Sequence, residues 1–531
     1  MVKMKRYEYK QLALIACFIG VGCGPAQQGG PDAGQDMSTG ADMPPAPDQG
    51  TPPDQGVGRA DAGAQDMSMN TPDLSPAQDM AVDMPDMATV DMQLTPDLGD
   101  MSAPDMQMPD MIVDMASAPD MPPIAPDMSQ DMSIQDMGVV ATPLELVRIS
   151  AGAAHTCGVD RQGAAWCWGE GSSGQLGDGM LTSQPSPVAV SMPAGVTFTE
   201  ISAGDDHTCA LSSSGSIYCW GLAGQGQVGD GGIDWRNLDF TRAVSAPVAI
   251  IAPAGVTFGE VSAGGRHTCA TSTTGQAYCW GEGRRGALGT GLGGTEIEDE
   301  PVAVAQPVGI FFGEIAAGKE HTCASGLNPV NMTYATYCWG ENMDGRLGTG
   351  SGAMIARAPE LVTRTNGGSA FLAPEVGHLH TCSHAVGAMQ QLYLYCWGSN
   401  SRGQLGNTVA PGGSITRPGD ITEIPAPDTF LEVELGEESS CGISSNGKAW
   451  CWGSDQHGQL GDGAGVMDVS TPTRVAQPAG TMFRWITVGA RHACAIDSLT
   501  DIAYCWGSDD SGQLGDGVTM GGAQSPTQVS R

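Results

Sequence analysis

Aromatic residues are missing from one long part of this chain. Residues 24–140 contain no Phe, Trp or Tyr, and they cycle through Pro-Asp-Met, Gln-Asp-Met and Ala-Pro-Asp. Without large apolar side chains, a segment cannot bury enough surface to offset the conformational entropy that folding removes. Residues 24–140 are therefore predicted to be a disordered, low-complexity linker.

Positive charge is also scarce. The chain has 23 Lys and Arg against 59 Asp and Glu, which gives a net charge of −36, and residues 24–140 hold 20 of these charges because Arg59 is their only base. Repulsion between like charges, together with frequent proline, keeps such a segment extended, with a reach on the order of 60 Å. We expect a stalk, and the acidic composition argues against a nucleic-acid partner.

The N-terminus lacks a hydrophobic run long enough to span a bilayer. In residues 1–23, basic residues precede a short apolar stretch that ends in small residues, which is the pattern of an export signal. Its end, Gly20-Val21-Gly22-Cys23, resembles the lipobox of bacterial lipoproteins, in which the cysteine is lipidated. Leu14-Ile15-Ala16-Cys17 matches the box better but leaves too short an apolar stretch. Cys23 is the predicted lipidation site, with ordinary signal cleavage or an uncleaved anchor as alternatives.

These features predict where the protein resides. A lipid anchor at Cys23 would hold the chain in the cell envelope, and Gly24 stands where an Asp is associated with retention in the inner membrane. The outer membrane or the cell surface is therefore the expected location. Behind an export signal, the 16 cysteines predict disulfides rather than metal or redox chemistry.

Helical periodicity is absent from residues 141–531, where a unit of 52 to 60 residues occurs seven times. Each copy has an apolar run, a Gly, two variable residues and His-Thr-Cys or a relative of it. A second strand ends in Cys-Trp-Gly, and a glycine-rich turn follows, as at 174–179 and 512–517. Small sheets that cannot bury their apolar faces alone pack radially and close into a ring. The sequence predicts an all-β, seven-bladed β-propeller over residues 141–531.

The motifs Gly-x-x-His, Cys-Trp-Gly and Gly-Gln-Leu-Gly-Asp-Gly together resemble the repeats of the regulator of chromosome condensation family, whose fold is a seven-bladed β-propeller. The resemblance covers residues 146–531. Three departures are local: Ser439-Ser440 replaces His-Thr in copy six, Val228 replaces Leu in copy two, and Pro374 stands where other copies have Ile or Val. The resemblance implies a binding role, because secreted bacterial members bind proteins with a propeller face.

An apolar residue lies nine positions before the His position of every copy. We interpret this residue, and the Trp of Cys-Trp-Gly, as packing between neighbouring blades. The seven residues are Leu146, Phe198, Phe258, Phe312, Phe371, Phe430 and Phe483.

The cysteines occur in pairs that fit β-hairpins. In four copies the two cysteines are ten residues apart, and a three-residue hairpin loop with a left-handed residue in third place, such as Gly163, sets Cys157 opposite Cys167. Opposed residues of antiparallel strands are close enough for a disulfide. The predicted disulfides are Cys157 with Cys167, Cys209 with Cys219, Cys269 with Cys279, Cys323 with Cys338, Cys382 with Cys396, Cys441 with Cys451 and Cys494 with Cys505.

Six histidines occupy one repeated position: His155, His207, His267, His321, His380 and His492. Equivalent positions on different blades are too far apart to share a metal ion, so we predict a structural hydrogen-bonding role. Three further histidines, His378, His384 and His457, have no ligand-like spacing. Scattered acids, namely Asp178, Asp230, Asp462 and Asp516, leave weak calcium binding open. No cofactor, metal site or catalytic set is predicted, and the protein is expected not to be an enzyme.

Residues that the repeat does not need are the candidates for binding. Copy two carries an insertion with Trp235, Arg236, Phe240 and nearby Arg242, and Trp485 lies off the repeated aromatic register. Trp and Arg are typical interface anchors, although the aromatic residues could instead fold back onto their own blade. Further insertions are the acidic run 296–300 and the loop 408–418.

The expected function is therefore a monomeric, non-enzymatic binding or adhesion scaffold at the cell surface, with a protein or glycan as its partner. Guanine-nucleotide exchange, the activity of the eukaryotic namesake of the family, is an alternative that needs a cytosolic GTPase. An extracellular hydrolase is a third alternative and needs an acid/base set that the sequence does not reveal.

Overall fold

The computed structural model describes residues 142–531 except 294–296, 364–370, 387–391, 408–410 and 417–428. The predicted signal peptide, the lipidation site Cys23 and the stalk lie outside the described residues. All described residues belong to one compact unit. Within them, no helix has the length and apolar character needed to cross a membrane.

The unit consists of seven four-stranded antiparallel sheets, and each sheet is formed by one sequence repeat. The first strands are β1 (Arg148–Ala151), β5 (Phe198–Ala203), β9 (Phe258–Ala263), β13 (Phe311–Ala317), β17 (Phe371–Val376), β21 (Phe430–Leu435) and β25 (Phe483–Val488). The second strands are β2 (His155–Val159), β6 (His207–Ser212), β10 (His267–Ser272), β14 (His321–Asn328), β18 (His380–Val386), β22 (Ser439–Ser444) and β26 (His492–Asp497). The third strands are β3 (Ala165–Gly169), β7 (Ile217–Leu222), β11 (Ala277–Glu282), β15 (Thr333–Glu341), β19 (Leu392–Ser399), β23 (Ala449–Gly453) and β27 (Ala503–Gly507). The fourth strands are β4 (Gln184–Ala189), β8 (Ala243–Ala249), β12 (Ile297–Ala303), β16 (Ile355–Leu361), β20 (Ser414–Ile415), β24 (Val469–Arg474) and β28 (Ala523–Gln528), and a 3-10 turn, η1 (Met343–Gly345), precedes β16.

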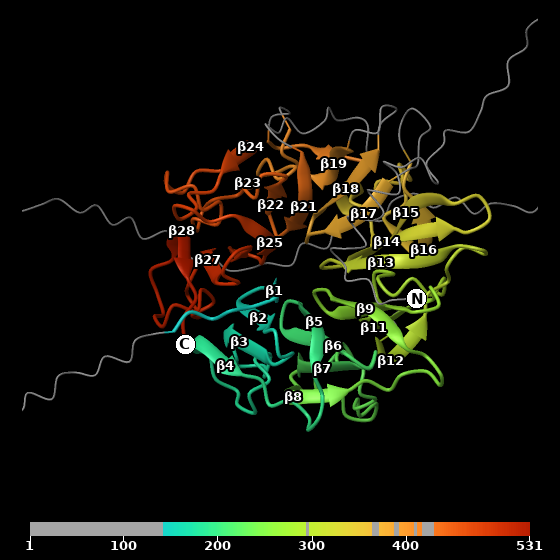
Figure 1. Ribbon diagram of the computed structural model, residues 1–531. Coiled ribbons are helices and arrows are strands. Elements are labelled where there is room, and N and C mark those ends of the chain that lie inside the picture. The colour runs from blue at the N-terminus through green and yellow to red at the C-terminus, as the bar shows by residue number, and fades with distance from the viewer. Residues whose placement is uncertain (1–141, 294–296, 364–370, 387–391, 408–410, 417–428) are drawn as a thin grey trace, which may run out of the picture. The chain divides into compact units, whose positions relative to one another are not determined.

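The sheets are arranged as the blades of a ring (Figure 1). Within each blade the strands pair in sequence order, and the first strands of neighbouring blades contact one another toward the centre. The second strands are the most deeply buried, since every residue of β2, β6 and β10 is buried. The structure confirms the predicted seven-bladed β-propeller.

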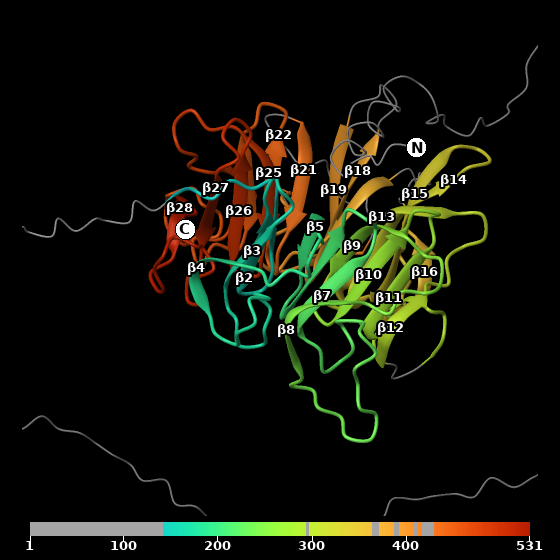
Figure 2. The ribbon, with the colours of Figure 1, turned by 60° about the horizontal axis from the view of Figure 1, so that its bottom comes forward.

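The ring has two different faces. Because each blade is an antiparallel meander, its first and third connections begin on one face, and its central hairpin and the link to the next blade lie on the other. We call these the turn face, which holds the dipeptides between Gly and His such as 153–154, and the hairpin face, which holds loops such as 160–164. Figure 2 shows an example of each: the long β7–β8 connection lies on the turn face, and the β14–β15 hairpin lies on the hairpin face.

Large side chains fill the space between blades, as predicted. Phe198 of blade two packs with Leu176 and Val159 of blade one, and the other six equivalent residues are also buried. Each Trp of Cys-Trp-Gly donates its indole N–H to a carbonyl of the preceding blade's glycine-rich turn at 2.9–3.0 Å, as from Trp220 to Gln175. Gly177 has φ of +68°, and a Cβ there would lie 2.7 Å from the Trp220 nitrogen, so only glycine fits.

All seven predicted disulfides are present, with Cα atoms 4.0–4.1 Å apart. Cys157 and Cys167 are direct partners in the β2–β3 register. Gly163 has φ of +80° and donates its N–H to the Asp160 carbonyl, which is the left-handed third loop position that the spacing required. No cysteine of the described residues is free.

The ring closes where the two ends of the described chain meet. The backbones of Thr142 and Arg531 exchange two hydrogen bonds of 3.0 Å, and Leu144 donates to Val529 at 3.2 Å. The segment that leads into blade one therefore also pairs with the outer edge of blade seven. The contact between blades seven and one is thus closed by residues from opposite ends of the described chain. We call the contact between two neighbouring blades a seam.

Candidate functional site

The repeated histidines link the blades. His155 of blade one lies 2.9 Å from the Thr208 hydroxyl of blade two, and this hydroxyl donates to the Gln175 carbonyl at 2.9 Å. Because the hydroxyl proton is used on the carbonyl, the Thr oxygen accepts from His155, which places the imidazole proton on Nε2. Equivalent pairs, at 2.8–3.0 Å, are His207 with Thr268, His267 with Thr322, His321 with Thr381, His380 with Ser440 and His492 with Thr156.

Burial keeps these histidines neutral. It lowers the pKa of His155 to about 4 and that of His207 to about 3. Their role is structural, as predicted, and the described residues contain no group of three His, Cys, Asp or Glu placed to hold a metal ion. Three of the scattered acids, Asp178, Asp462 and Asp516, cap turns, since each accepts the N–H of the second residue after it.

The seam between blades six and seven lacks the link between His and Thr. Blade six has Ser439 at the His position, and blade seven has Ala493 at the Thr position, so both members of the same pair are missing. The Ser439 hydroxyl is buried and has no hydrogen-bond partner. The Gln459 carbonyl in this seam keeps only the bond from Trp506. Two departures that lie far apart in sequence are therefore one departure in space.

The variable residues between Gly and His meet at the centre of the turn face. His378 of blade five places Nε2 3.1 Å from Asp205 Oδ1 of blade two, on the far side of the ring. Its Nδ1 lies 3.8 Å from Glu437 Oε1 of blade six, and Lys319 Nζ of blade four lies 4.0 Å from the same oxygen. We call these four residues the axial cluster.

His378 is charged at neutral pH. Burial lowers its pKa, but the hydrogen bond to Asp205 and the negative charges of Asp205 and Glu437 outweigh burial and raise the pKa to about 9. Burial also disfavours the charged form of Asp205 and so acts to raise its pKa. The hydrogen bond from His378 outweighs this effect and holds the pKa of Asp205 below its ordinary value. His378 was predicted to lie outside every repeated pattern. It nevertheless directly follows the repeated Gly of its copy, as Asp205 does, and this shared position could have indicated that the two residues lie on the same face of the ring.

The axial cluster predicts a pH-dependent stability. Because the folded-state pKa of His378 lies above its ordinary value, its stabilising effect is complete below pH 6.5 and is lost as the pH rises through about 9. We expect His378→Gln to lower the free energy of unfolding by roughly 2 kcal/mol at pH 6 and by far less at pH 10. Urea unfolding at both pH values measures this difference, with His457→Gln as the control. A loss of equal size at both pH values would contradict the prediction.

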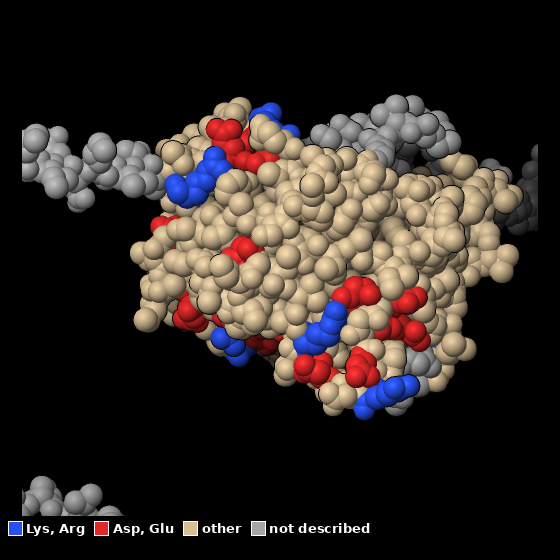
Figure 3. All heavy atoms as spheres, turned by 90° about the horizontal axis from the view of Figure 1, so that it is seen from below, with Lys and Arg blue, Asp and Glu red and all other residues tan. Residues whose placement is uncertain are grey.

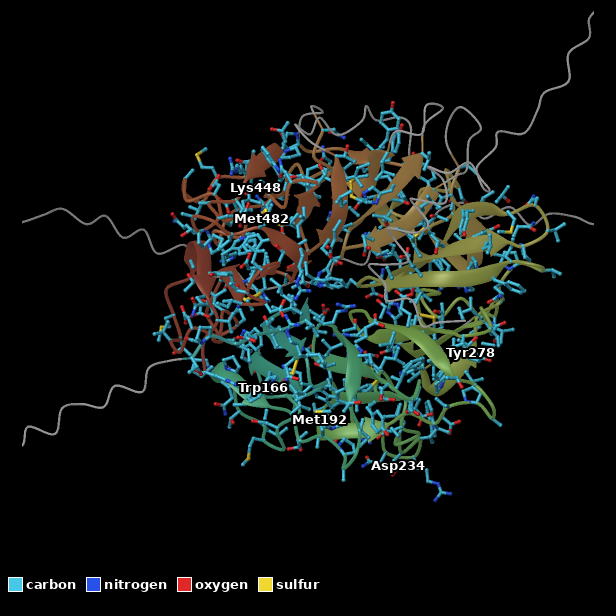
Figure 4. The ribbon with its side chains drawn as sticks, in the orientation of Figure 1. Trp166, Met192, Asp234, Tyr278, Lys448 and Met482 are labelled. Carbon is cyan, nitrogen blue, oxygen red and sulfur yellow. A yellow bond between two sulfur atoms is a disulfide. The ribbon has the colours of Figure 1, made fainter. Side chains whose placement is uncertain are left out.

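The insertion of copy two forms a loop over 230–242 at the outer edge of blade two, where Asp234 projects from the ring (Figure 4). Its base is closed by a hydrogen bond from Ala223 N–H to the Arg242 carbonyl. Gly224 permits this closure, since a Cβ there would lie 2.3 Å from the backbone of Phe240. The side chains of Arg242 and Asp230 form an ion pair with a hydrogen bond of 3.1 Å. Arg242, a predicted partner-binding residue, therefore supports the loop.

Blade three also fixes this loop. The Asp299 carboxylate accepts the N–H of Ile233 at 3.1 Å, and the Asp299 carbonyl accepts the N–H of Gly231 at 2.9 Å. Within the loop, Asp234 and Asp239 each accept the N–H two residues ahead. The structure thus brings the aromatic insertion of copy two together with the acidic run of copy three, of which residue 296 lies outside the described residues.

The tip of the loop exposes apolar side chains on this fixed frame. Trp235 is 56% exposed, Leu238 46% and Phe240 44%, so Trp235 and Phe240 are not folded into their own blade. Arg236 is exposed as well. Three of the five predicted partner-binding residues, Trp235, Arg236 and Phe240, are thus accessible.

Trp485 does not lie on a binding surface. It is 9% exposed, its indole N–H donates to the Ile149 carbonyl at 3.1 Å, and the Arg148 guanidinium lies 4.7 Å from its ring centre. This tryptophan packs in the seam between blades seven and one, and its position outside the repeated aromatic register reflects ring closure. The prediction that Trp485 contacts a partner is corrected accordingly.

Comparison with known proteins identifies relatives of this architecture. A family model described as the RCC1-like domain matches residues 126–495. The ultraviolet-B receptor UVR8 of Arabidopsis thaliana is 31% identical over 402 residues, which cover 74% of this chain and 83% of the receptor. The human E3 ubiquitin-protein ligase HERC2 is 28% identical over 362 residues, which cover 67% of this chain but only 7% of the ligase.

Solved structures show the same fold. Yeast RCC1 (Prp20), in complex with Kap60, superposes with a TM-score of 0.58 at 21% identity, covering 74% of this chain and 86% of Prp20. Prp20p of Saccharomyces cerevisiae, solved in a study of its binding to Gsp1p and histones, also gives 0.58, at 22% identity over 70% of this chain and 87% of that protein.

Proposed function

The chain belongs to the RCC1-like domain family, and from that premise we propose that its propeller is a non-enzymatic scaffold that binds a protein or glycan partner at the cell surface. The loop 230–242 carries this proposal, because it holds two aromatic side chains in water on a frame fixed by hydrogen bonds. Preorganised, exposed aromatic residues favour binding, since little conformational entropy is lost when a partner covers them.

The repeated residues support a scaffold rather than an enzyme. The six repeated histidines, the seven tryptophans and the cysteines are used in links between or within blades. The exposed insertions are not used in these links, and a partner can be recognised there without replacing residues that hold the blades together.

Attachment to the cell envelope is the second half of the proposal. It is supported by the lipobox-like sequence before Cys23 and by the acidic stalk, which would hold the propeller away from a membrane. Labelling of intact cells with a membrane-impermeant reagent should modify the propeller, and Cys23→Ala should release the protein from the membrane fraction. A protein recovered in the cytosol would contradict this half.

Partner capture tests the loop directly. We expect Trp235→Ala with Phe240→Ala to reduce the recovery of cross-linked partner from the producing cells by about tenfold or more, as for interface anchors. Val308→Ala with Phe311→Ala, which truncates exposed apolar side chains elsewhere, is the matched control and should recover the partner normally. Equal recovery by both variants would count against the loop.

Among the described residues, none points specifically to guanine-nucleotide exchange. The likeness to Prp20p is below a quarter identity and shows the fold alone, so the binding of that protein to Gsp1p and histones is not transferred. The predicted export signal also separates the chain from cytosolic GTPases.

A further inference from the structure

We infer that the loop 230–242 and the start of β12, residues 298–300, form a docking surface for a polypeptide segment that carries basic side chains next to apolar ones. This inference rests on the proposed binding function and names the class of partner. We call this surface the rim site.

The rim site is assembled from two repeats. Asp299 of blade three holds the backbone of Ile233 and Gly231 of blade two, so the acidic strand and the aromatic loop are fixed side by side. The site is therefore a built surface, although about sixty residues of sequence separate its two parts.

Its charge is mainly negative. The rim site contains the acids Asp230, Asp234, Asp239, Glu298, Asp299 and Glu300 and the bases Arg236 and Arg242. Arg242 is paired with Asp230, which leaves Arg236 as the one base outside that ion pair. Figure 3, which views the molecule from below Figure 1, shows acidic side chains gathered at one edge of this face with basic side chains among them, and further groups of charged side chains elsewhere on it. Such a surface attracts a cationic segment and repels an anionic one.

The apolar side chains define the rest of the partner. Trp235, Leu238 and Phe240 are exposed among these acids, and an indole face is the preferred aromatic partner of Arg and Lys side chains. A segment with both basic and apolar residues would cover the three apolar side chains while its charges meet the carboxylates. A purely apolar partner would leave the carboxylates desolvated and unpaired.

The test is a titration of the full chain with a fluorescent nine-residue peptide in which arginine and leucine alternate, followed by fluorescence anisotropy. Asp234→Asn, Asp239→Asn and Glu300→Gln together remove three charges, and the asparagines keep acceptors for the loop's backbone hydrogen bonds. We expect this variant to bind about tenfold more weakly at low salt and to lose most of its salt dependence. Trp235→Ala with Phe240→Ala should weaken binding by about tenfold or more.

The matched control is a second neutralised triplet, Asp178→Asn, Asp462→Asn and Asp516→Asn, which removes three turn-capping acids from blades one, six and seven. The acidic residues 24–140 are the same in every variant, so differences report the rim site alone. An equal loss in the control triplet would show general charge attraction and would overturn the inference.

Comparison peptides separate this inference from the proposed function. Equal affinity for a glutamate–leucine peptide, or for an arginine–serine peptide without apolar residues, would overturn the inference. Sedimentation experiments that show dimers which depend on the loop 230–242 would also overturn the inference, because the rim site would then bind a second copy of this chain. If such a result came with partner capture that still depends on Trp235 and Phe240, the binding function would stand and only the partner class would fall.

Discussion

Reduction of the seven disulfides is expected to lower the thermal midpoint of the propeller by about 20 °C or more, and so to unfold it at temperatures where the oxidised protein is stable. Each disulfide closes a loop of 10 to 15 residues within one hairpin. Such a loop contributes about 2.5 to 3 kcal/mol by limiting the unfolded chain. Seven contributions of this size match or exceed the whole stability of an ordinary domain, about 5 to 15 kcal/mol. Circular dichroism with and without a phosphine reductant measures the shift.

Removal of one disulfide measures how much a single bond contributes to the free energy of unfolding. Cys157→Ser with Cys167→Ser removes one disulfide and should lower the free energy of unfolding by about 2 to 3 kcal/mol. Both cysteines are completely buried, so mass spectrometry must show that reduction is complete before midpoints are compared. A fully reduced protein that melts within a few degrees of the oxidised one would refute the expectation.

The second large effect is expected at a buried ion pair in blade four. Arg346 is 2% exposed, and its guanidinium donates to Glu341 at 2.9 Å and to the His378 carbonyl at 3.2 Å. Glu341 also pairs with Arg285 of blade three. Glu341→Ala leaves the Arg346 charge buried without this carboxylate and should cost about 3 to 5 kcal/mol in urea unfolding.

The repeat itself supplies the compensating variant. Blade seven has Ser508 and Gln513 where blade four has Glu341 and Arg346, and Gln513 donates to the Ser508 hydroxyl at 3.3 Å. Glu341→Ser with Arg346→Gln therefore replaces a buried ion pair with a neutral pair that already fits this fold. We expect the double variant to regain most of the stability that Glu341→Ala loses, because no charge remains buried. A double variant as unstable as the single one would show that the position needs the charges themselves.

The fold was predictable because its determinants are local and occur seven times. The spacing around Gly163 gave the hairpin loop and hence the pairing of Cys157 with Cys167, and the structure has both. Phe198 and its equivalents in the other copies were correctly predicted to pack between blades. A position that is apolar in every copy must face a surface that every copy has, and the neighbouring blade is such a surface.

The candidate site was only partly predictable. Trp235 and Phe240 are exposed, as a binding loop requires, but Trp485 is buried in the closing seam and His378 was overlooked. Both errors concern contacts between blades that are distant in the sequence. His378 meets Asp205 across the ring, and Trp485 meets Ile149 only because the two ends of the propeller join.

By itself, the sequence determined the number of blades, the strands and the cysteine pairing, because these follow from turn geometry and alternation within a repeat. The tertiary structure decided which departures from the repeat belong together. Ser439 and Ala493 form one missing link, Asp299 supports the loop of another blade, and four variable residues converge on the axis. The physical reason is that closing a ring sets the distance between two residues by blade geometry, so their separation along the chain no longer determines whether they meet.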